Sequence, residues 1–296
     1  MDRGADFDAL VEMAMAAPGR AHMRPVIEKE LLHYDILFCL DQEGLLDRLT
    51  FQGGTALRLC HASPRFSEDL DFAGGKDFAG AQLKEMKACI EHFVGGRYGL
   101  EVFGKEPSEL REEADYAGIT VDKWQVAVVT APQRREVPRQ RIKIEVAGVP
   151  AYSREPRPLL ANYEFLPDGY GDTLIMTETL DEVMADKLVS LVNTVRYVRH
   201  RDIWDLRWLK QRGAVVRPEW VRRKIEDYGI QDYQERLQAM RSRLPEIIYG
   251  QAFRSEMVRF IPADVQERTL NKDKFYEFLL SEIQGLLSSL PELLRE

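Results

Sequence analysis

Two glycines at the start of a helix-forming run, followed by two aspartates one residue apart, constrain this chain more than any other part of its 296 residues. Residues 51–58 read Phe-Gln-Gly-Gly-Thr-Ala-Leu-Arg. This run predicts a short strand, a turn at Gly53 and Gly54, and a helix for which Thr55 is the N-cap. Glycines let a backbone approach a ligand closely, and a helix N-terminus presents N–H groups and partial positive charge to an anion. The pattern therefore predicts a phosphate-binding turn.

The second half of this feature reads Arg-Phe-Ser-Glu-Asp-Leu-Asp-Phe over residues 65–72 and predicts a strand that carries Asp69 and Asp71. Strand residues two apart project from one face, so both carboxylates can reach one divalent cation or a metal pair. Ser67 is expected on that same face and Arg65 beside it, so both are candidates for contact with phosphate. A glycine pair alone usually marks a plain turn, and Asp-x-Asp alone usually marks a solvated strand. Their combination favours phosphate and metal chemistry, which nucleotidyl transfer requires.

A third carboxylate is placed by the alternation of a later strand, expected over residues 141–149. Ile142 and Ile144 share one face of that strand, and Glu145 lies on the other. Exposure to solvent is the ordinary explanation for such a glutamate. A two-metal site, however, needs a third acid on a neighbouring strand. We therefore predict that Glu145 joins Asp69 and Asp71 as a metal ligand.

These residues resemble the first motif of the AbiEii-type abortive-infection toxin nucleotidyltransferases, a branch of the polymerase-beta-like superfamily that acts in bacterial toxin–antitoxin pairs. The resemblance continues in the expected order through three more stretches: Arg141-Ile142-Lys143-Ile144-Glu145-Val146, Asp186-Lys187-Leu188 and Arg201-Asp202-Ile203-Trp204-Asp205-Leu206. It covers residues from about 50 to 210, and Trp204 stands where Tyr is expected in the family. It implies an α+β fold: a polymerase-beta-like nucleotidyltransferase core with a mixed sheet and a helical C-terminal half.

The resemblance also implies roles for two residues of the helical half. The lysine that matches Lys187 contacts the triphosphate in that family, although a lysine beside an apolar helix face is most often a surface residue. Asp202 matches the acidic position after arginine and is expected to orient Lys187 or the incoming hydroxyl. An ordinary contact between aspartate and arginine at a helix start explains Asp202 almost equally well. Asp205 is interpreted as structural.

The chemistry expected of the site is attack by a hydroxyl on the α-phosphorus of an NTP, with pyrophosphate as leaving group. Two Mg²⁺ ions are expected, because oxygen-rich ligation suits this ion. Asp69 and Asp71 would bridge them, and Glu145 would hold the catalytic ion and take the proton of the hydroxyl. The turn formed by Gly53, Gly54 and Thr55 would receive the β- and γ-phosphates.

The leading functional hypothesis is a toxin that transfers NMP from an NTP to an RNA acceptor, with the 3′ end of tRNA as the expected target. The resemblance also implies a cognate antitoxin, encoded nearby, as the partner. Two alternatives remain open. In one, the acceptor is a protein side chain or a small molecule; in the other, the chain is a non-catalytic module that only binds nucleotide or a partner.

The charge balance limits how RNA could be held. A net charge of −8 argues against a broad basic face, although local clusters can contact phosphate. The sequence contains three such clusters: Arg134, Arg135, Arg139, Arg141 and Lys143; Arg196, Arg199, His200 and Arg201; and Arg222, Arg223 and Lys224. A basic cluster is ordinarily a solvated surface. The first two clusters, however, flank the catalytic stretches, and at least one of them is predicted to face phosphate.

Composition indicates a soluble globular protein, with 45% hydrophobic and 30% charged residues. No apolar run has the length of a membrane span, and the first residues lack a signal-peptide pattern, so a cytoplasmic location is expected. Cys39, Cys60 and Cys89 lack Cys-x-x-Cys spacing and are expected to be buried free thiols. A shift to helical patterning near residue 175 predicts two domains. Residues 1–174 would form the α/β nucleotidyltransferase domain with N-terminal helices, and residues 175–296 a helical domain that completes the active site.

Overall fold

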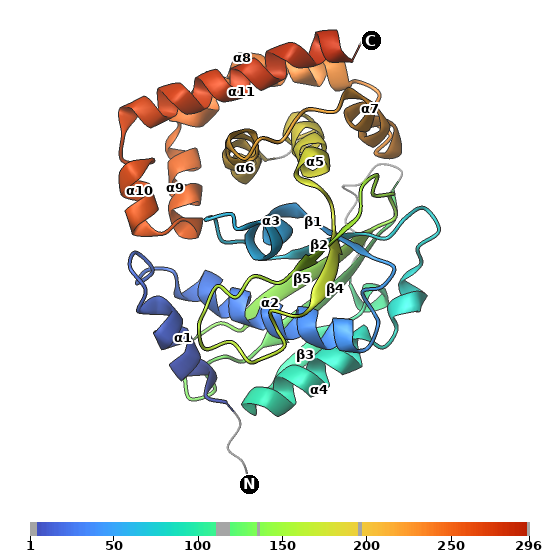
Figure 1. Ribbon diagram of the computed structural model, residues 1–296, viewed down its shortest axis with the longest axis vertical. Coiled ribbons are helices and arrows are strands. Elements are labelled where there is room, and N and C mark those ends of the chain that lie inside the picture. Colours follow the sequence, from blue (N-terminus) through green and yellow to red (C-terminus); the bar gives the residue numbers. More distant parts are fainter. Residues whose placement is uncertain (1–4, 111–118, 135–136, 195–196, 295–296) are drawn as a thin grey trace. The chain divides into compact units, whose positions relative to one another are not determined.

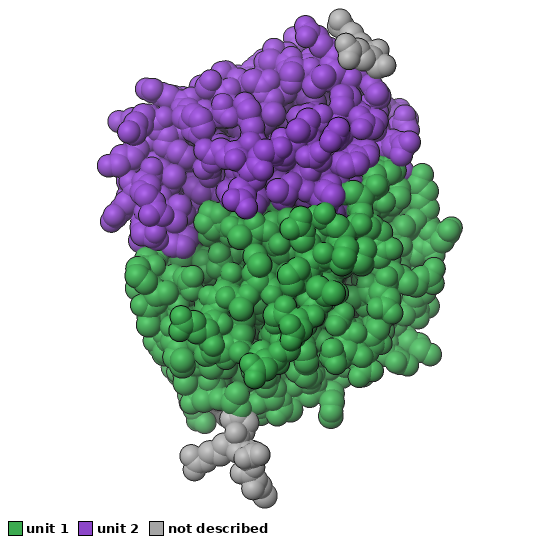
Figure 2. All heavy atoms as spheres, viewed as in Figure 1, with its two compact units in different colours: residues 1–116, 120–177 green, residues 117–119, 178–296 purple. Residues whose placement is uncertain are grey.

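The structure is a computed structural model that describes residues 5–110, 119–134, 137–194 and 197–294. The chain divides into two compact units, which Figure 2 shows in different colours. Unit 1 comprises residues 1–116 and 120–177, and unit 2 comprises residues 117–119 and 178–296. The main passage of the chain from one unit to the other lies between Thr177 and Glu178.

A seven-stranded mixed sheet organises unit 1 (Figure 1). The neighbouring pairs β2–β5 and β1–β7 are parallel, and the other pairs are antiparallel. The mixed sheet predicted from the sequence is confirmed. In spatial order the strands are β3 (Val102–Lys105), β4 (Val121–Val128), β5 (Gln140–Ala147), β2 (Leu70–Ala73), β1 (Thr50–Gln52), β7 (Leu174–Thr177) and β6 (Glu155–Pro158).

Helices cover one face of this sheet. Helix α2 lies along α4, and these two contact β5 and β3 respectively (Figure 1). The alternation of β5 follows from this packing: Ile142 and Ile144 are fully buried, whereas Arg141 and Lys143 are exposed on the opposite face. The helices of unit 1 are α1 (Phe7–Met15), α2 (Arg24–Gln42), α3 (Gly53–His61) and α4 (Met86–Tyr98), with short 3₁₀ turns at Gly80–Leu83 and Pro107–Glu109.

From Glu178 onward, the regular elements described in unit 2 are all helices. The Thr179 side chain accepts a hydrogen bond from the Glu182 N–H at 3.4 Å and so caps α5, as its sequence predicts. Helix α11 runs along α8 (Figure 1). The helices are α5 (Leu180–Val192), α6 (His200–Gln211), α7 (Pro218–Asp227), α8 (Tyr233–Tyr249), α9 (Gln251–Phe260), α10 (Ala263–Arg268) and α11 (Asp273–Leu293). Among the described helices, none is both long and apolar enough to cross a membrane.

Candidate active site

Two predicted metal ligands lie side by side in the sheet of unit 1. Asp71 of β2 is the register partner of Glu145 on the neighbouring parallel strand β5. Register partners on adjacent strands share a face, so the two carboxylates project from the same surface of the sheet. Neither side chain is fully exposed, and Glu145 is only 20% exposed. The sheet therefore brings together two acids that lie far apart in the sequence.

Asp69 lies next to this pair but not within a strand. The strand was predicted to carry both aspartates; β2 instead begins at Leu70, so only Asp71 belongs to it. The Asp69 carboxylate accepts a hydrogen bond from the Lys143 N–H at 3.3 Å, which fixes it beside β5. Burial raises the pKa of Asp69 above its ordinary value, although Lys29 and the Lys143 N–H act in the opposite direction. Its carboxylate thus lies in a protected position next to β5.

The glycine turn packs directly against the acidic strand. Gly53 has a φ of +77°, and a Cβ at this position would lie 2.6 Å from Asp71 Oδ2. A Cβ at Gly54 would collide with the Arg65 guanidinium and would lie 2.8 Å from Ser67 Oγ. The turn can therefore approach the carboxylate so closely only because it has no side chains. Four residues predicted to bind nucleotide, Gly53, Gly54, Arg65 and Ser67, are thus in one place.

The first turn of α3 differs in detail from the prediction. The helix begins at Gly53 with Gln52 as the N-cap, so the assignment of Thr55 as the N-cap is wrong. The Thr55 hydroxyl is buried and donates to the Asp69 carbonyl oxygen, which ties the helix to the acidic segment. Gln52 makes no side-chain capping bond. Because the first four N–H groups of an α-helix lack intrahelical acceptors, the N–H groups from Gly53 onward suit an anion.

Arg65 and Ser67 support this turn from within the protein. Both are buried, and the Arg65 guanidinium donates to the Phe66 carbonyl at 2.8 Å. Ser67 lies in the segment before β2, so its predicted place on the strand is wrong. Its hydroxyl nevertheless faces the helix start at Gly54. The two side chains therefore shape the turn that is predicted to bind phosphate.

Gly53→Ala is expected to lower nucleotide transfer about 10-fold or more, because the new Cβ must displace the Asp71 carboxylate as well as strain the backbone. Gly213→Ala is the matched control: Gly213 also has a positive φ, of +85°, but a Cβ there meets no atom within 4 Å. It should lose about 1 kcal/mol of stability and no activity. Turnover of labelled NTP and thermal denaturation measure the two effects. Equal activity of both variants would show that Asp71 does not need its present position.

The oxygen atoms around Asp71 are suitable ligands for a divalent cation. Asp69, Asp71 and Glu145 supply carboxylate oxygens, which Mg²⁺ prefers. Gln52, the register partner of Asp71 on β1, has a buried Oε1 with no hydrogen-bond partner among the described residues. A buried oxygen without a donor is costly, so a further group is expected to satisfy it. Oxygen-rich chemistry and an unsatisfied acceptor together suit a hydrated metal ion.

Lys123 was not identified from the sequence, yet it lies beside this site. It is the register partner of Glu145 on β4, and its Nζ is 3.4 Å from Glu145 Oε1. The lysine side chain is only 16% exposed. Its position across the sheet depends on the register between β4 and β5, which no local motif of the sequence reveals. Lys123 adds a positive charge to the acidic end of the site.

In unit 2, Lys187 is held by two carboxylates of α6. Its Nζ is 2.6 Å from Asp202 Oδ1 and 3.2 Å from Asp205 Oδ2. The lysine side chain is 13% exposed and both acids are buried, so it is not a surface lysine. Burial opposes ionisation of Asp202, but Lys187, Arg199 and Ser190 more than offset it, and the pKa of Asp202 lies below its ordinary value. The expected contact between Asp202 and Lys187 is present, and Asp205 joins it.

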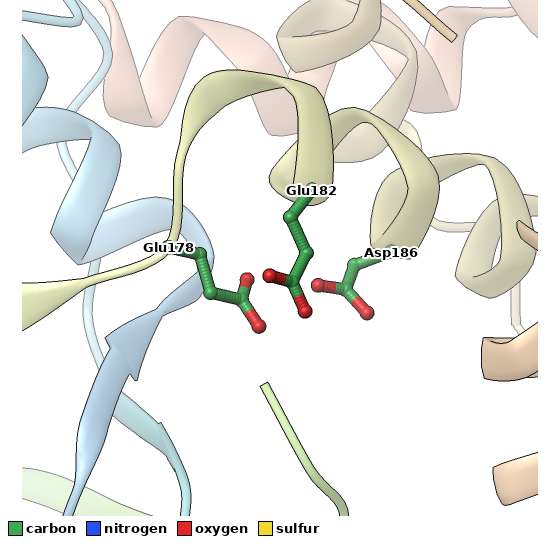
Figure 3. A group of neighbouring side chains, drawn as sticks. All are labelled: Glu178, Glu182 and Asp186. Atoms are coloured by element: carbon green, nitrogen blue, oxygen red, sulfur yellow. The ribbon is translucent and has the colours of Figure 1, made fainter. Parts of the chain in front are cut away.

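A second acidic group in unit 2 surrounds a lysine. The carboxylates of Glu178, Glu182 and Asp186 point toward one another (Figure 3). Lys224 Nζ lies 3.1 Å from Glu178, 2.8 Å from Glu182 and 2.9 Å from Asp186. Since the ammonium already supplies the positive charge, we assign no metal to this group. The expectation that Lys224 lies in a solvated cluster is wrong, because the residue is completely buried.

The two basic clusters predicted to flank the site differ in their surroundings. Of the second, His200 and Arg201 contact Glu256, at 2.8 Å and 3.3 Å. Of the first, Arg134, Arg139 and Arg141 line a cavity in unit 1. Arg135 and Arg196, which belong to these two clusters, lie outside the described residues.

Comparison with known proteins identifies the family. A profile described as "Nucleotidyl transferase AbiEii toxin, Type IV TA system" matches residues 35–280. The chain belongs to this family. The resemblance found in the sequence is therefore confirmed, and the protein is a nucleotidyltransferase toxin of a type IV toxin–antitoxin system. Membership implies an NTP substrate, a divalent metal and an antitoxin partner. No curated protein matches the chain.

Two solved structures are similar to the chain, and one of them supports the fold. The chain is similar to MenT4, a nucleotidyltransferase toxin from Mycobacterium tuberculosis H37Rv, with 18% identity and a TM-score of 0.58 over 97% of this chain and 91% of that one. A putative nucleotidyltransferase from H. pylori has 19% identity and a TM-score of 0.49, over 90% of this chain and 97% of the other. The similarity to MenT4 confirms the α+β nucleotidyltransferase fold expected from the sequence.

Proposed function

We propose that this toxin uses Mg²⁺ to transfer NMP from an NTP to a hydroxyl of an RNA acceptor, and that the acceptor is the 3′ end of tRNA. The observation that carries the proposal is the placement of Asp71 beside Glu145, next to the glycine start of α3. This juxtaposition supplies candidate metal ligands and a helix terminus suited to phosphate at the central strands of the sheet. The RNA acceptor is proposed from the resemblance seen in the sequence, and the basic side chains near the site support it.

In this reaction the hydroxyl oxygen bonds to the α-phosphorus, and the bond from that phosphorus to the bridging oxygen breaks to release pyrophosphate. Mg²⁺, when bound by Asp69, Asp71 and Glu145, would neutralise charge on the attacking and leaving oxygens. Glu145 takes the proton of the attacking hydroxyl. The N–H groups of Gly53, Gly54 and Thr55 hold the β- and γ-phosphates at the start of α3.

The remaining residues position the nucleotide. Arg65 and Ser67, packed against Gly54, keep the turn in its binding conformation and are proposed neighbours of the phosphates. The helical half contributes Lys187 and Asp202, by the family's motif. Lys187 contacts the triphosphate, and Asp202 orients the ammonium through their 2.6 Å contact.

The decisive experiment incubates the protein with each α-labelled NTP, total RNA and Mg²⁺, with EDTA as the control. A labelled RNA that forms only with the metal supports the proposal, and a labelled band of tRNA size identifies the acceptor. Label on protein or on a small molecule would replace the RNA acceptor with another class. Absence of any metal-dependent pyrophosphate release would contradict transfer itself.

Lys187→Ala is expected to raise the KM for NTP about 10- to 100-fold, because it removes one charge-assisted contact with phosphate. Lys187→Arg should recover only part of this loss, since the arginine fork requires a different geometry from a compact ammonium. Lys187→Ala also leaves Asp202 and Asp205 without their cation, so melting temperature is measured alongside KM. Lys210→Ala, which breaks an exposed ion pair with Glu282, should change neither. A lower melting temperature with unchanged KM would make Lys187 purely structural.

A further inference from the structure

The sheet face that carries Glu145 becomes basic and then aromatic toward the start of β5. Arg141 and Lys143 precede Glu145 by four and two residues and therefore share its face. Arg141 lies opposite Ala127 on β4, and Ala127 lies opposite Phe103 on the edge strand β3. Four strand residues span about 13 Å. The row that contains Phe103 and Arg141 thus lies about that far along the face from the row of Asp71 and Glu145.

A basic cavity adjoins this row. It has a volume of about 760 Å³, and Arg141 is one of its lining residues. Arg134, Arg139 and Lys29 also line it, while Glu101 is the single acid among the described lining residues. Lys29 pairs with Glu68 at 2.9 Å, so three arginines remain against Glu101 and give this lining a positive balance in a chain whose net charge is −8. Such a concentration of positive charge favours a polyanion.

An exposed aromatic ring stands at the same place. Phe103 is 42% exposed, so a large part of its side chain is open to solvent. The Arg139 guanidinium lies 4.5 Å from the centre of its ring. Aromatic rings and guanidinium planes are the surfaces on which unpaired bases stack. We call Phe103, Arg139 and Arg141 the stacking platform.

We propose that the stacking platform binds a single-stranded segment of the RNA acceptor close to its reacting end. Phosphates would lie along Arg141 and the adjoining basic cavity, and one unpaired base would stack on Phe103. A strand stacked as in a duplex rises about 3.4 Å per nucleotide, so the 13 Å to the carboxylates corresponds to at most about four nucleotides. An unpaired strand is favoured over a duplex because duplex bases are not free to stack on a side chain. This inference rests on the proposed function, since it needs an RNA acceptor.

The test measures binding of a fluorescently labelled single-stranded RNA to the full chain, without NTP, at several salt concentrations. Phe103→Ala should weaken binding about tenfold and leave the salt dependence unchanged, because stacking is not ionic. Arg141→Ala should weaken binding and reduce the slope of log K against log salt by about 0.7, the value for one phosphate contact on a single strand. Phe103→Trp should retain affinity, which separates stacking from misfolding.

Matched controls come from unit 2. Phe278 is 41% exposed and Arg243 is exposed on α8, so Phe278→Ala and Arg243→Ala should bind RNA as the wild type does. Unchanged RNA affinity in Phe103→Ala and Arg141→Ala, or no RNA binding by the wild type, would overturn the inference. Transfer of label from NTP to RNA by the wild type is assayed in parallel. Transfer combined with unaffected platform variants would refute only the platform, whereas platform-dependent binding without transfer would refute only the proposed function.

Discussion

Asp71→Asn is expected to reduce nucleotide transfer by at least about 10³-fold while the protein stays folded. Asp71 faces Glu145 across the β2–β5 pair and contacts the glycine turn, so it is central to the proposed metal and phosphate sites. A bound metal ion supplies several kcal/mol of transition-state stabilisation, and each 1.36 kcal/mol is a factor of ten in rate. The amide has the shape of the carboxylate but lacks its charge. Label transfer and circular dichroism together measure the outcome.

Asp77→Asn is the matched control, because Asp77 is an exposed aspartate shortly after β2 in the sequence. It should keep full activity. On expression in a bacterial host, the Asp71→Asn variant should not inhibit growth, whereas the Asp77→Asn variant should inhibit growth as strongly as the wild type. If Asp71→Asn transferred nucleotide at nearly the wild-type rate, the metal assignment would be wrong. If a variant without transfer activity inhibited growth as strongly as the wild type, the growth inhibition would have a cause other than nucleotide transfer.

The core of the candidate site could be predicted because its parts are local. A glycine turn before a helix and two closely spaced acids have recognisable chemistry wherever they occur. The alternation of β5 correctly placed Glu145 on the face opposite Ile142 and Ile144. Lys123 could not be predicted, because its contact with Glu145 depends on which residues of β4 and β5 are opposite each other. Register between distant strands is set by packing, which a single sequence does not reveal.

Prediction of the fold from the sequence was least successful at prolines and at short elements. β6 reads Glu-Pro-Arg-Pro, and prolines argue against a strand, but this strand lies at the sheet edge where a missing N–H is tolerated. Helix α8 continues to Tyr249 with Pro245 inside it, although a proline usually ends or kinks a helix. The five elements β3, β6, β7, α9 and α10 carried no pattern strong enough to be predicted. Local propensity was overridden at these places by packing.

Lys224 is a single residue whose surroundings could not be predicted from the local sequence. The run Arg222-Arg223-Lys224 was interpreted as a solvated cluster, yet helical geometry turns neighbouring residues to different faces. Lys224 points inward from α7 and contacts three acids of the segment around α5, at 2.8–3.1 Å. Its surroundings depend on the packing of α7 against α5. The consequence is a large predicted effect on stability rather than on chemistry.

Lys224→Met is expected to reduce the free energy of unfolding of the helical unit by about 3–5 kcal/mol at neutral pH. Methionine fills the space of the lysine stem but leaves the carboxylates of Glu178, Glu182 and Asp186 without their cation. Removing one partner of a buried ionic group is costly because the remaining charges stay desolvated. Chemical denaturation measures the loss. Lys274→Met, at an exposed lysine on α11, should change stability by no more than about 0.5 kcal/mol.

The loss caused by Lys224→Met should be larger at pH 8 than at pH 5. Burial, followed by Asp186, raises the pKa of Glu178 well above its ordinary value of 4.5, and Lys224 opposes this rise. The folded state therefore keeps a proton that the unfolded state releases, so this group's contribution to stability falls as pH increases above 4.5. Without Lys224 the pKa of Glu178 rises further, so the decrease in stability continues to higher pH. Adding Glu178→Gln should recover part of the loss at pH 8, whereas equal stability of Lys224→Met and Lys274→Met at that pH would refute the proposed role of Lys224.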